Sequence, residues 1–184
     1  MRVIAGTYRS RILKSLKGTA LRPTSDRLRE TLFNILGPAV AGSRFMDIFA
    51  GTGAVGIEAL SRGAIQAVFI ENHPPAAALI RGNLESLDAL AGAKILPLDA
   101  LRGLEKLCAP GATALYDFIF LDPPYAAEQD YLRVLRFLST NALLAPHATV
   151  IAEHYKTFSL PEQIGGLNRT RILLQGDAAL SFFS

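Results

Sequence analysis

Cysteine is nearly absent from this sequence of 184 residues, in which Cys108 stands alone. A single cysteine excludes a disulfide framework and any zinc or iron–sulfur site built from cysteines. Because His73, His147 and His154 show no spacing typical of ligands, we expect no bound metal. Long hydrophobic runs are also missing, since no stretch reaches the roughly 18 apolar residues that a membrane span needs.

Targeting segments, internal repeats and low-complexity tracts are missing as well. Residues 1–3 do not open a secretory signal, so we expect a cytoplasmic protein without a membrane partner. Charged residues make up 19% of the chain and hydrophobic residues 50%, which excludes a disordered chain. Such a chain can bury one core without disulfide or metal staples, and we expect a monomer with no obligate protein partner.

Positive charge is concentrated in the first quarter of the chain. Residues 1–44 hold nine basic and two acidic side chains, whereas residues 45–184 hold ten basic and fourteen acidic ones. The first part therefore has a net charge of +7 and the second of −4. A basic segment beside an acidic body is typical of a surface that contacts a polyanion. A solvated basic face is the alternative interpretation.

Residues 1–43 are predicted to form a separate basic extension. Residues 3–6 and 11–13 flank a polar turn and predict a small hairpin. Thr24 or Ser25 can cap a helix that runs to about Gly37.

From residue 44 onward, patterns of strands and helices alternate up to residue 184. The predicted strands cover 45–49, 67–70, 94–98, 116–121, 149–152, 170–174 and 179–183, and the predicted helices cover 54–62, 75–90, 100–107 and 129–138. The last two strands are joined by a short turn at 175–177, which favours an antiparallel hairpin. The sequence therefore predicts an α/β fold: a Rossmann-like, seven-stranded, mostly parallel sheet with an antiparallel C-terminal hairpin and helices on both faces.

In such a sheet, ligands bind at the carboxyl ends of the strands. After the first strand, Gly51, Gly53 and Gly56 match the G-x-G-x-x-G pattern of nicotinamide and flavin enzymes, in which the backbone approaches the ligand closely. Asp47 lies inside the apolar strand, so it must be paired if buried. Either a ligand ammonium or nearby backbone N–H groups would pair it.

Acidic residues also end the second and third strands. Glu71 lies 20 residues beyond Gly51, where a carboxylate can accept hydrogen bonds from a ribose diol. Asp99 could accept a hydrogen bond from an adenine amino group. In both cases the alternative is a residue that caps the following helix.

The fourth strand ends in the tetrapeptide Asp-Pro-Pro-Tyr at residues 122–125. Its prolines hold the chain extended and donate no N–H, which leaves the Asp122 carboxylate and the Pro123 carbonyl as acceptors at a fixed place. The ring of Tyr125 stands beside them. A Pro-Pro turn is commonplace by itself, but at this position it favours a site for a planar base with an exocyclic amine.

With these residues, the segment 44–184 resembles the class I S-adenosylmethionine-dependent methyltransferases. The tetrapeptide resembles the (Asp/Asn/Ser)-Pro-Pro-(Tyr/Phe) signature of the branch that methylates amines. Over the whole chain, the sequence is similar to the bacterial 16S rRNA guanine-N2 methyltransferases of the RsmD type. This narrower resemblance rests on residues 2–6, 22–34, 59–64, 176–177 and 180–182.

The resemblance implies binding of S-adenosylmethionine, release of S-adenosylhomocysteine, and no metal. The cofactor-binding residues that it implies are Asp47, Phe49, Gly51, Gly53, Glu71, Asn72, Asp99, Ala100 and Asp122. It implies catalysis by Asp122, Pro123 and Tyr125 on a base that leaves its stack. The implied partner is 16S rRNA or the assembled small ribosomal subunit. The basic residues expected to contact this RNA are Arg2, Arg9, Arg11, Lys14, Arg22 and Arg27, and the segment 22–24 is similar to one that closes over the cofactor.

Three other functions stay open on the sequence. A DNA adenine-N6 or cytosine-N4 methyltransferase shares the tetrapeptide, although such enzymes usually carry a target-recognition domain for which we expect no room here. A nicotinamide-dependent oxidoreductase would use the glycine pattern. A non-catalytic RNA-binding protein is the third alternative, and the intact tetrapeptide argues against it.

Overall fold

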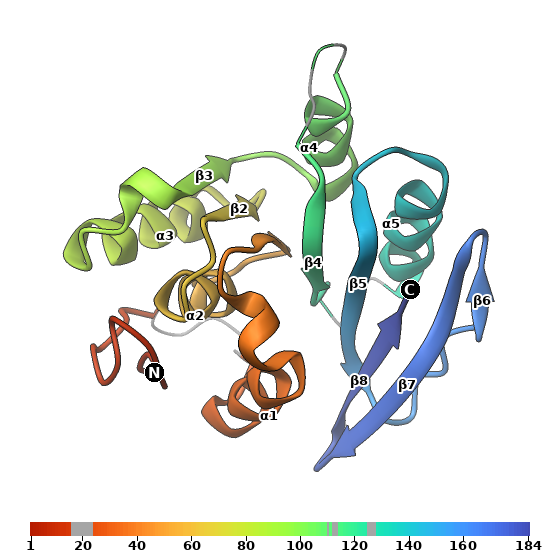
Figure 1. Cartoon of the computed structure of the whole chain (residues 1–184), viewed down its shortest axis with the longest axis horizontal. Helices are drawn as coiled ribbons and strands as arrows, with labels where there is room; N and C mark the ends of the chain where they lie inside the picture. The colour runs from red at the N-terminus through yellow and green to blue at the C-terminus, as the bar shows by residue number, and fades with distance from the viewer. Residues whose placement is uncertain (16–23, 110, 112–113, 125–127) are drawn as a thin grey trace.

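The computed structural model describes residues 1–15, 24–109, 111, 114–124 and 128–184. Its strands form one sheet in the order β3-β2-β1-β4-β5-β8-β7-β6 (Figure 1). The strands are β1 (Arg44–Ile48), β2 (Gln66–Ile70), β3 (Ala93–Leu96), β4 (Tyr116–Leu121), β5 (Leu144–Tyr155), β6 (Gln163–Ile164), β7 (Leu167–Gln175) and β8 (Ala178–Phe183). The helices are α1 (Asp26–Leu36), α2 (Ala54–Ser61), α3 (Pro74–Ser86), α4 (Ala100–Leu107) and α5 (Glu128–Thr140), with 3-10 turns at Gly37–Val40 and Leu90–Gly92.

The predicted α/β architecture is confirmed, but the predicted number of strands is wrong. The sheet has eight strands rather than seven, because β6 pairs antiparallel with β7 through Ile164 and Leu167. A strand of two residues is too short to produce a recognisable alternation of apolar and polar side chains. The antiparallel end of the sheet is otherwise as predicted, with β8 pairing antiparallel to both β5 and β7.

The order of the parallel strands reverses at β1. This strand pairs in parallel with β2 on one side and with β4 on the other, so the chain crosses to opposite halves of the sheet from this point. At such a reversal the loops that follow the two central strands diverge and leave a crevice for a ligand. The loop after β1 and the Asp-Pro-Pro segment after β4 therefore share the edge of the sheet at which a ligand would bind.

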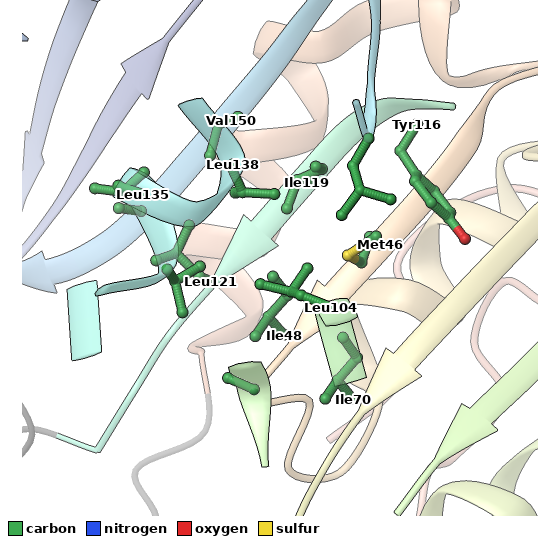
Figure 2. Packing of buried hydrophobic residues seen from close by; sticks show 14 of the residues in the cluster. Met46, Ile48, Ile70, Leu104, Tyr116, Ile119, Leu121, Leu135, Leu138 and Val150 are labelled. Atoms are coloured by element: carbon green, nitrogen blue, oxygen red, sulfur yellow. The ribbon is translucent and has the colours of Figure 1, made fainter. Parts of the chain in front are cut away.

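Helices cover both faces of the sheet. On one face, Leu104 of α4 and Leu135 of α5 join a core cluster with Met46, Ile48 and Ile119 of the central strands (Figure 2). On the other face, α1 and α2 pack against β1, β4 and β5, while α2 and α3 cover β2. Within the described part of the chain, no helix is long and apolar enough to cross a membrane.

The N-terminal residues form the predicted small hairpin, reduced to one bridge. Arg2 and Ile12 make an isolated antiparallel bridge, and the N–H of Val3 donates to the carbonyl of Arg11 at 2.9 Å. Ser25, rather than Thr24, caps α1 by accepting the N–H of Leu28 at 3.1 Å. The helix then buries its apolar side in the same cluster as β1 and β4.

A buried ionic network fastens this extension to α2. Glu58 is fully buried and accepts the N–H groups of Ile4 and Ala5 at 2.8 and 3.0 Å. Its carboxylate also accepts from Arg62 Nε at 2.8 Å and lies 3.8 Å from Nε of Arg29, which is itself fully buried. We call Glu58, Arg29 and Arg62 the N-terminal clamp. The boundary at residue 43 remains a prediction.

Candidate active site

The loop after β1 is shaped by glycines. Gly51 and Gly53 have φ angles of 54° and 75°, in the left-handed region that side chains rarely adopt. Gly56 has another purpose, because a Cβ there would lie 2.4 Å from the ring of Phe69. Two glycines thus turn the loop, and the third lets α2 pack closely on β2. Phe49, before the turn, also has a positive φ of 62°.

Two acidic side chains brace this loop. Asp47, which is 2% exposed, accepts the backbone N–H of Gly56 at 2.9 Å. Glu71 follows β2, and its two carboxylate oxygens accept the N–H groups of Gly51 at 2.7 Å and His73 at 2.8 Å. Glu71 is therefore a buried residue that ties the glycine loop to the end of β2, rather than a solvated one.

The predicted residues near β3 lie at its carboxyl end. Asp99 is exposed and caps α4, accepting the N–H of Arg102 at 3.1 Å. Ala100 is buried in the first turn of the helix, and Asn72 is exposed after β2. The structure thus realises the capping arrangement for Asp99, and its contact with an adenine remains a prediction.

Asp122 and Pro123 lie directly after β4. The N–H of Asp122 donates to the carbonyl of Ile48 at 3.4 Å, which links the start of the motif to the end of β1. Pro123 is buried, whereas Pro124 is exposed. Tyr125, the last residue of the predicted motif, lies outside the described residues.

A third acidic residue, which the sequence analysis missed, joins this region. Glu153 on β5 is 4% exposed and comes directly after Ala152, the partner of Leu121 in the neighbouring strand β4. It is therefore level with Asp122 across the two strands. Its Oε2 accepts a hydrogen bond from the Thr24 hydroxyl at 2.7 Å.

Asp47, Asp122 and Glu153, which we call the acidic cluster, raise one another's pKa values. Burial, assisted by the charges of Glu71 and Glu153, raises the pKa of Asp47 to about 8, although the N–H of Gly56 acts in the opposite direction. Burial and the charges of Glu153 and Asp47 raise the pKa of Asp122 well above its usual range. A site with this electrostatics favours a ligand that brings positive charge or N–H donors.

These residues fit S-adenosylmethionine. Its ammonium and sulfonium groups are positively charged and complement the acidic cluster, and its ribose hydroxyls can donate to Glu71. A Cβ built on Gly51 would find no atom nearer than the Phe49 carbonyl at 4.0 Å, so the loop offers open backbone to a ligand. A dinucleotide would instead bring an anionic pyrophosphate to the same edge. Within the described ranges, no group of three or more His, Cys, Asp or Glu residues could hold a metal ion.

The predicted RNA-contacting residues lie on the surface of the extension. Arg2, Arg9 and Arg27 are exposed. Lys14 is also exposed, and Asn83 of α3 accepts its backbone N–H at 2.9 Å while donating to the Thr52 carbonyl of the glycine loop at 3.1 Å. The basic surface is thus fastened beside the glycine loop.

The remaining two predicted RNA contacts differ from these. Arg11 is exposed, and its guanidinium donates to the Ser86 carbonyl at 2.8 Å. Arg22 lies outside the described residues.

The strand order, the glycine loop and the acidic cluster beside an Asp-Pro-Pro segment define a class I S-adenosylmethionine-dependent methyltransferase. More distant structures of the same fold include an RNA methyltransferase from Salinibacter ruber in complex with S-adenosyl-L-homocysteine, at a TM-score of 0.62 and 15% identity over 87% of this chain and 91% of that one. The family model described as Conserved hypothetical protein 95 matches residues 1–184, and the chain belongs to that family.

Named relatives support the same assignment. The chain is 38% identical over 160 residues to ribosomal RNA small subunit methyltransferase D of Haemophilus influenzae, covering 85% of this chain and 79% of the relative. It is 39% identical over 171 residues to a Bacillus subtilis protein provisionally named rRNA methyltransferase YlbH, covering 93% and 91%. An Escherichia coli structure provisionally named methyltransferase yhhF superposes with a TM-score of 0.83 at 32% identity, covering 100% of this chain and 96% of that one.

Proposed function

We propose that this methyltransferase transfers a methyl group from S-adenosylmethionine to the exocyclic N2 amine of one guanine in 16S ribosomal RNA. The observation that carries the proposal is the pair of acceptors at the end of β4, Asp122 and Pro123, placed beside the glycine loop and within an acidic environment. Relatives named as methyltransferases of small-subunit ribosomal RNA support this substrate. On this proposal the enzyme works in the cytoplasm as a monomer, on the RNA or on the assembled subunit.

The amine of guanine is a poor nucleophile because its lone pair is delocalised into the ring. Hydrogen bonds from its two N–H groups to the Asp122 carboxylate and the Pro123 carbonyl favour a more tetrahedral nitrogen. The lone pair then points out of the plane of the base, toward the side from which the methyl group comes. Bound S-adenosylmethionine supplies that methyl group on a sulfonium sulfur. Much of the rate enhancement comes from this positioning.

Transfer leaves a positive charge on the nitrogen, which loses a proton to become a neutral secondary amine. Asp122 is suited to receive this proton, because burial and neighbouring charges raise the pKa of its carboxyl. Glu153 and Asp47 add negative charge close by, which stabilises the cationic nitrogen during transfer. The acidic cluster thus serves both the positively charged methyl donor and the product amine.

The basic extension supplies affinity for the RNA. Arg2, Arg9, Lys14 and Arg27 are exposed on it and can bind phosphates, while the clamp and Asn83 hold the extension beside the site. Arg22 and Tyr125 complete the proposal from the sequence alone: Arg22 as a further phosphate contact, and Tyr125 as the ring on which the flipped base stacks.

Two measurements test this function together. Mass-spectrometric mapping of ribosomal RNA from cells with and without the gene should show one N2-methylguanosine that depends on it. In vitro, Asp122→Ala should lower kcat by about 100-fold or more while the affinity for S-adenosylmethionine stays within a few-fold, because Asp122 acts mainly in the transition state.

Asp130→Ala is a matched control, since it removes only a surface carboxylate paired with Arg133 on α5. It should keep wild-type activity. If Asp122→Ala kept more than about a tenth of the wild-type kcat, a loss of under about 1.4 kcal/mol, the role of Asp122 would be wrong. A methyl group mapped to another atom would exclude guanine N2 as the target.

A further inference from the structure

Glu153 is the one member of the acidic cluster to which the proposed mechanism assigns no contact. It is 4% exposed, lies on β5 level with Asp122 of the neighbouring strand, and raises the pKa values of both Asp122 and Asp47. Burial of a carboxylate beside two others opposes folding unless the group has a use that compensates. Its position one strand beyond the amine-binding acceptors places it on the flank of the target base.

Thr24 fixes the position of this carboxylate. The hydroxyl of Thr24 donates to Oε2 of Glu153 at 2.7 Å, and the backbone carbonyl of Glu153 accepts from the Tyr131 hydroxyl at 2.6 Å. Two hydroxyl groups therefore orient the residue from opposite elements, the start of α1 and the middle of α5. A carboxylate has about four positions for accepting hydrogen bonds, so the bond from Thr24 leaves capacity for donors of a ligand.

The bases differ in what lies next to the amine that is methylated. In guanine, the N2 amine is followed along the same edge by N1–H, so two neighbouring groups donate hydrogen bonds. In adenine and cytosine, the amine is followed by a ring nitrogen that accepts. A carboxylate placed next to the amine-binding acceptors therefore gains a hydrogen bond from guanine and faces a lone pair in the other two bases.

We propose that Glu153 is a specificity-determining residue, whose carboxylate accepts the N1–H of the target guanine while Asp122 and Pro123 hold the N2 amine. This inference rests on the proposed function, and it adds the group that makes the enzyme choose guanine among bases that carry an exocyclic amine. Rejection of adenine and cytosine follows because two acceptors would meet in a site that excludes water, and neither would find a donor.

The analogue 2-aminopurine separates this role from a structural one. It keeps an amine at C2, but its N1 is an unprotonated acceptor. The probe is small-subunit RNA carrying either guanosine or 2-aminopurine at the mapped position, introduced by ligation of a synthetic fragment. We expect wild-type kcat/KM to favour guanosine by about 100-fold or more. In Glu153→Gln, the amide can donate to N1 of 2-aminopurine, and we expect the preference to fall by about 30-fold or more.

The ratio of the two substrates is measured in one enzyme preparation, so partial misfolding of the variant cancels. Glu105→Gln on α4 is the matched control, because it neutralises an exposed glutamate and should leave the ratio unchanged. If Glu153→Gln lowered both rates equally, or left both unchanged, Glu153 would not read N1–H.

Failure of the proposed function gives a different result. In that case the wild-type enzyme does not methylate guanosine N2 in either RNA, whatever residue stands at position 153. If the wild type methylates guanosine and 2-aminopurine equally well, the proposed function stands and the assignment of Glu153 is overturned.

Discussion

Two groups of buried carboxylates in this molecule differ in what surrounds them. In the N-terminal clamp, Glu58 receives two backbone N–H groups and lies against the guanidinium groups of Arg29 and Arg62. In the acidic cluster, each of Asp47 and Asp122 has the charges of other carboxylates among the causes that raise its pKa. The fold compensates the first group by itself, whereas the second becomes fully compensated only when a ligand brings donors or positive charge.

The comparison separates stability from function in terms that can be measured. Removing a compensated carboxylate should destabilise the protein, because its buried partners lose their counter-charge. Removing an uncompensated one should stabilise the free protein and weaken ligand binding or catalysis. Sites that bind ligands often retain such unfavourable local arrangements.

The largest expected effect is at the clamp. Glu58→Ala leaves Arg29 buried without its counter-charge and two backbone N–H groups without their acceptor, so we expect a loss of about 3–5 kcal/mol in the free energy of unfolding. Urea denaturation followed by circular dichroism measures this loss. Glu105→Ala, at an exposed position on α4, should change stability by less than about 0.5 kcal/mol. A similarly small effect at Glu58 would contradict its role as the fastening residue.

Asp47→Asn should have the opposite sign. In the wild type, the pKa of Asp47 is about 8 in the folded protein against 3.8 for an ordinary aspartate. Between these values the unfolded chain ionises first, so wild-type stability falls as the pH rises, by at most about 1.4 kcal/mol per pH unit. Asparagine has no such cost and can still accept the N–H of Gly56.

The stability of Asp47→Asn relative to the wild type should therefore rise by about 2 kcal/mol between pH 5.5 and 7.5. Urea titrations of both proteins at the two pH values measure this difference, and other titrating groups cancel in it. Saturating S-adenosylmethionine should reduce it. A constant difference across this range would show that Asp47 does not hold its proton in the folded protein.

Glu71 sharpens the comparison, because it is paired with backbone N–H groups and yet predicted to bind ribose. Glu71→Ala should weaken the affinity for S-adenosylmethionine by about 1.5–3 kcal/mol, through lost hydrogen bonds to the ligand and a looser glycine loop. Isothermal titration calorimetry measures the affinity. Unchanged affinity would make Glu71 a purely structural residue, and binding of NADH without S-adenosylmethionine would contradict the assignment of the site.

The smallest expected effect concerns charge on the outer face of the extension. Arg9 is exposed, and a phosphate bound to it would release about 0.7–0.9 of a counterion. Arg9→Ala should reduce the slope of log K against log salt by that amount and weaken RNA binding by about 1 kcal/mol at moderate salt. Filter binding across a salt series measures the slope. Lys106→Ala, an exposed change at the end of α4, should leave it unchanged.

The sequence predicted the parallel half of the sheet well because its strands are apolar runs between recognisable turns. Strand β4 begins and ends where predicted, at Tyr116 and Leu121. Polar residues at strand ends indicated Asp47, Glu71, Asp99 and Asp122, and the same reasoning applied to the fifth strand would have found Glu153. That strand is predicted to end at Ala152 but continues to Tyr155, so the glutamate was not considered.

The clamp could not be predicted in this way. Glu58 and Arg29 lie on helices, where a charged residue ordinarily indicates the solvent-exposed side. Their burial depends on how the hairpin and α1 come together on α2, and no local pattern encodes that arrangement.

The position of β8 in the sheet has a consequence for how the protein is made. This strand comes last in the chain among the elements of the sheet, yet it lies between β5 and β7, and its Phe183 is fully buried. During synthesis from the N-terminus, β5 emerges from the ribosome with one edge unpaired, and β8 can cover that edge only after translation has passed residue 183. The sheet is thus completed after translation rather than during it. A newly made chain that stops short of β8 exposes the edge of β5, and we expect it to be aggregation-prone and dependent on chaperones.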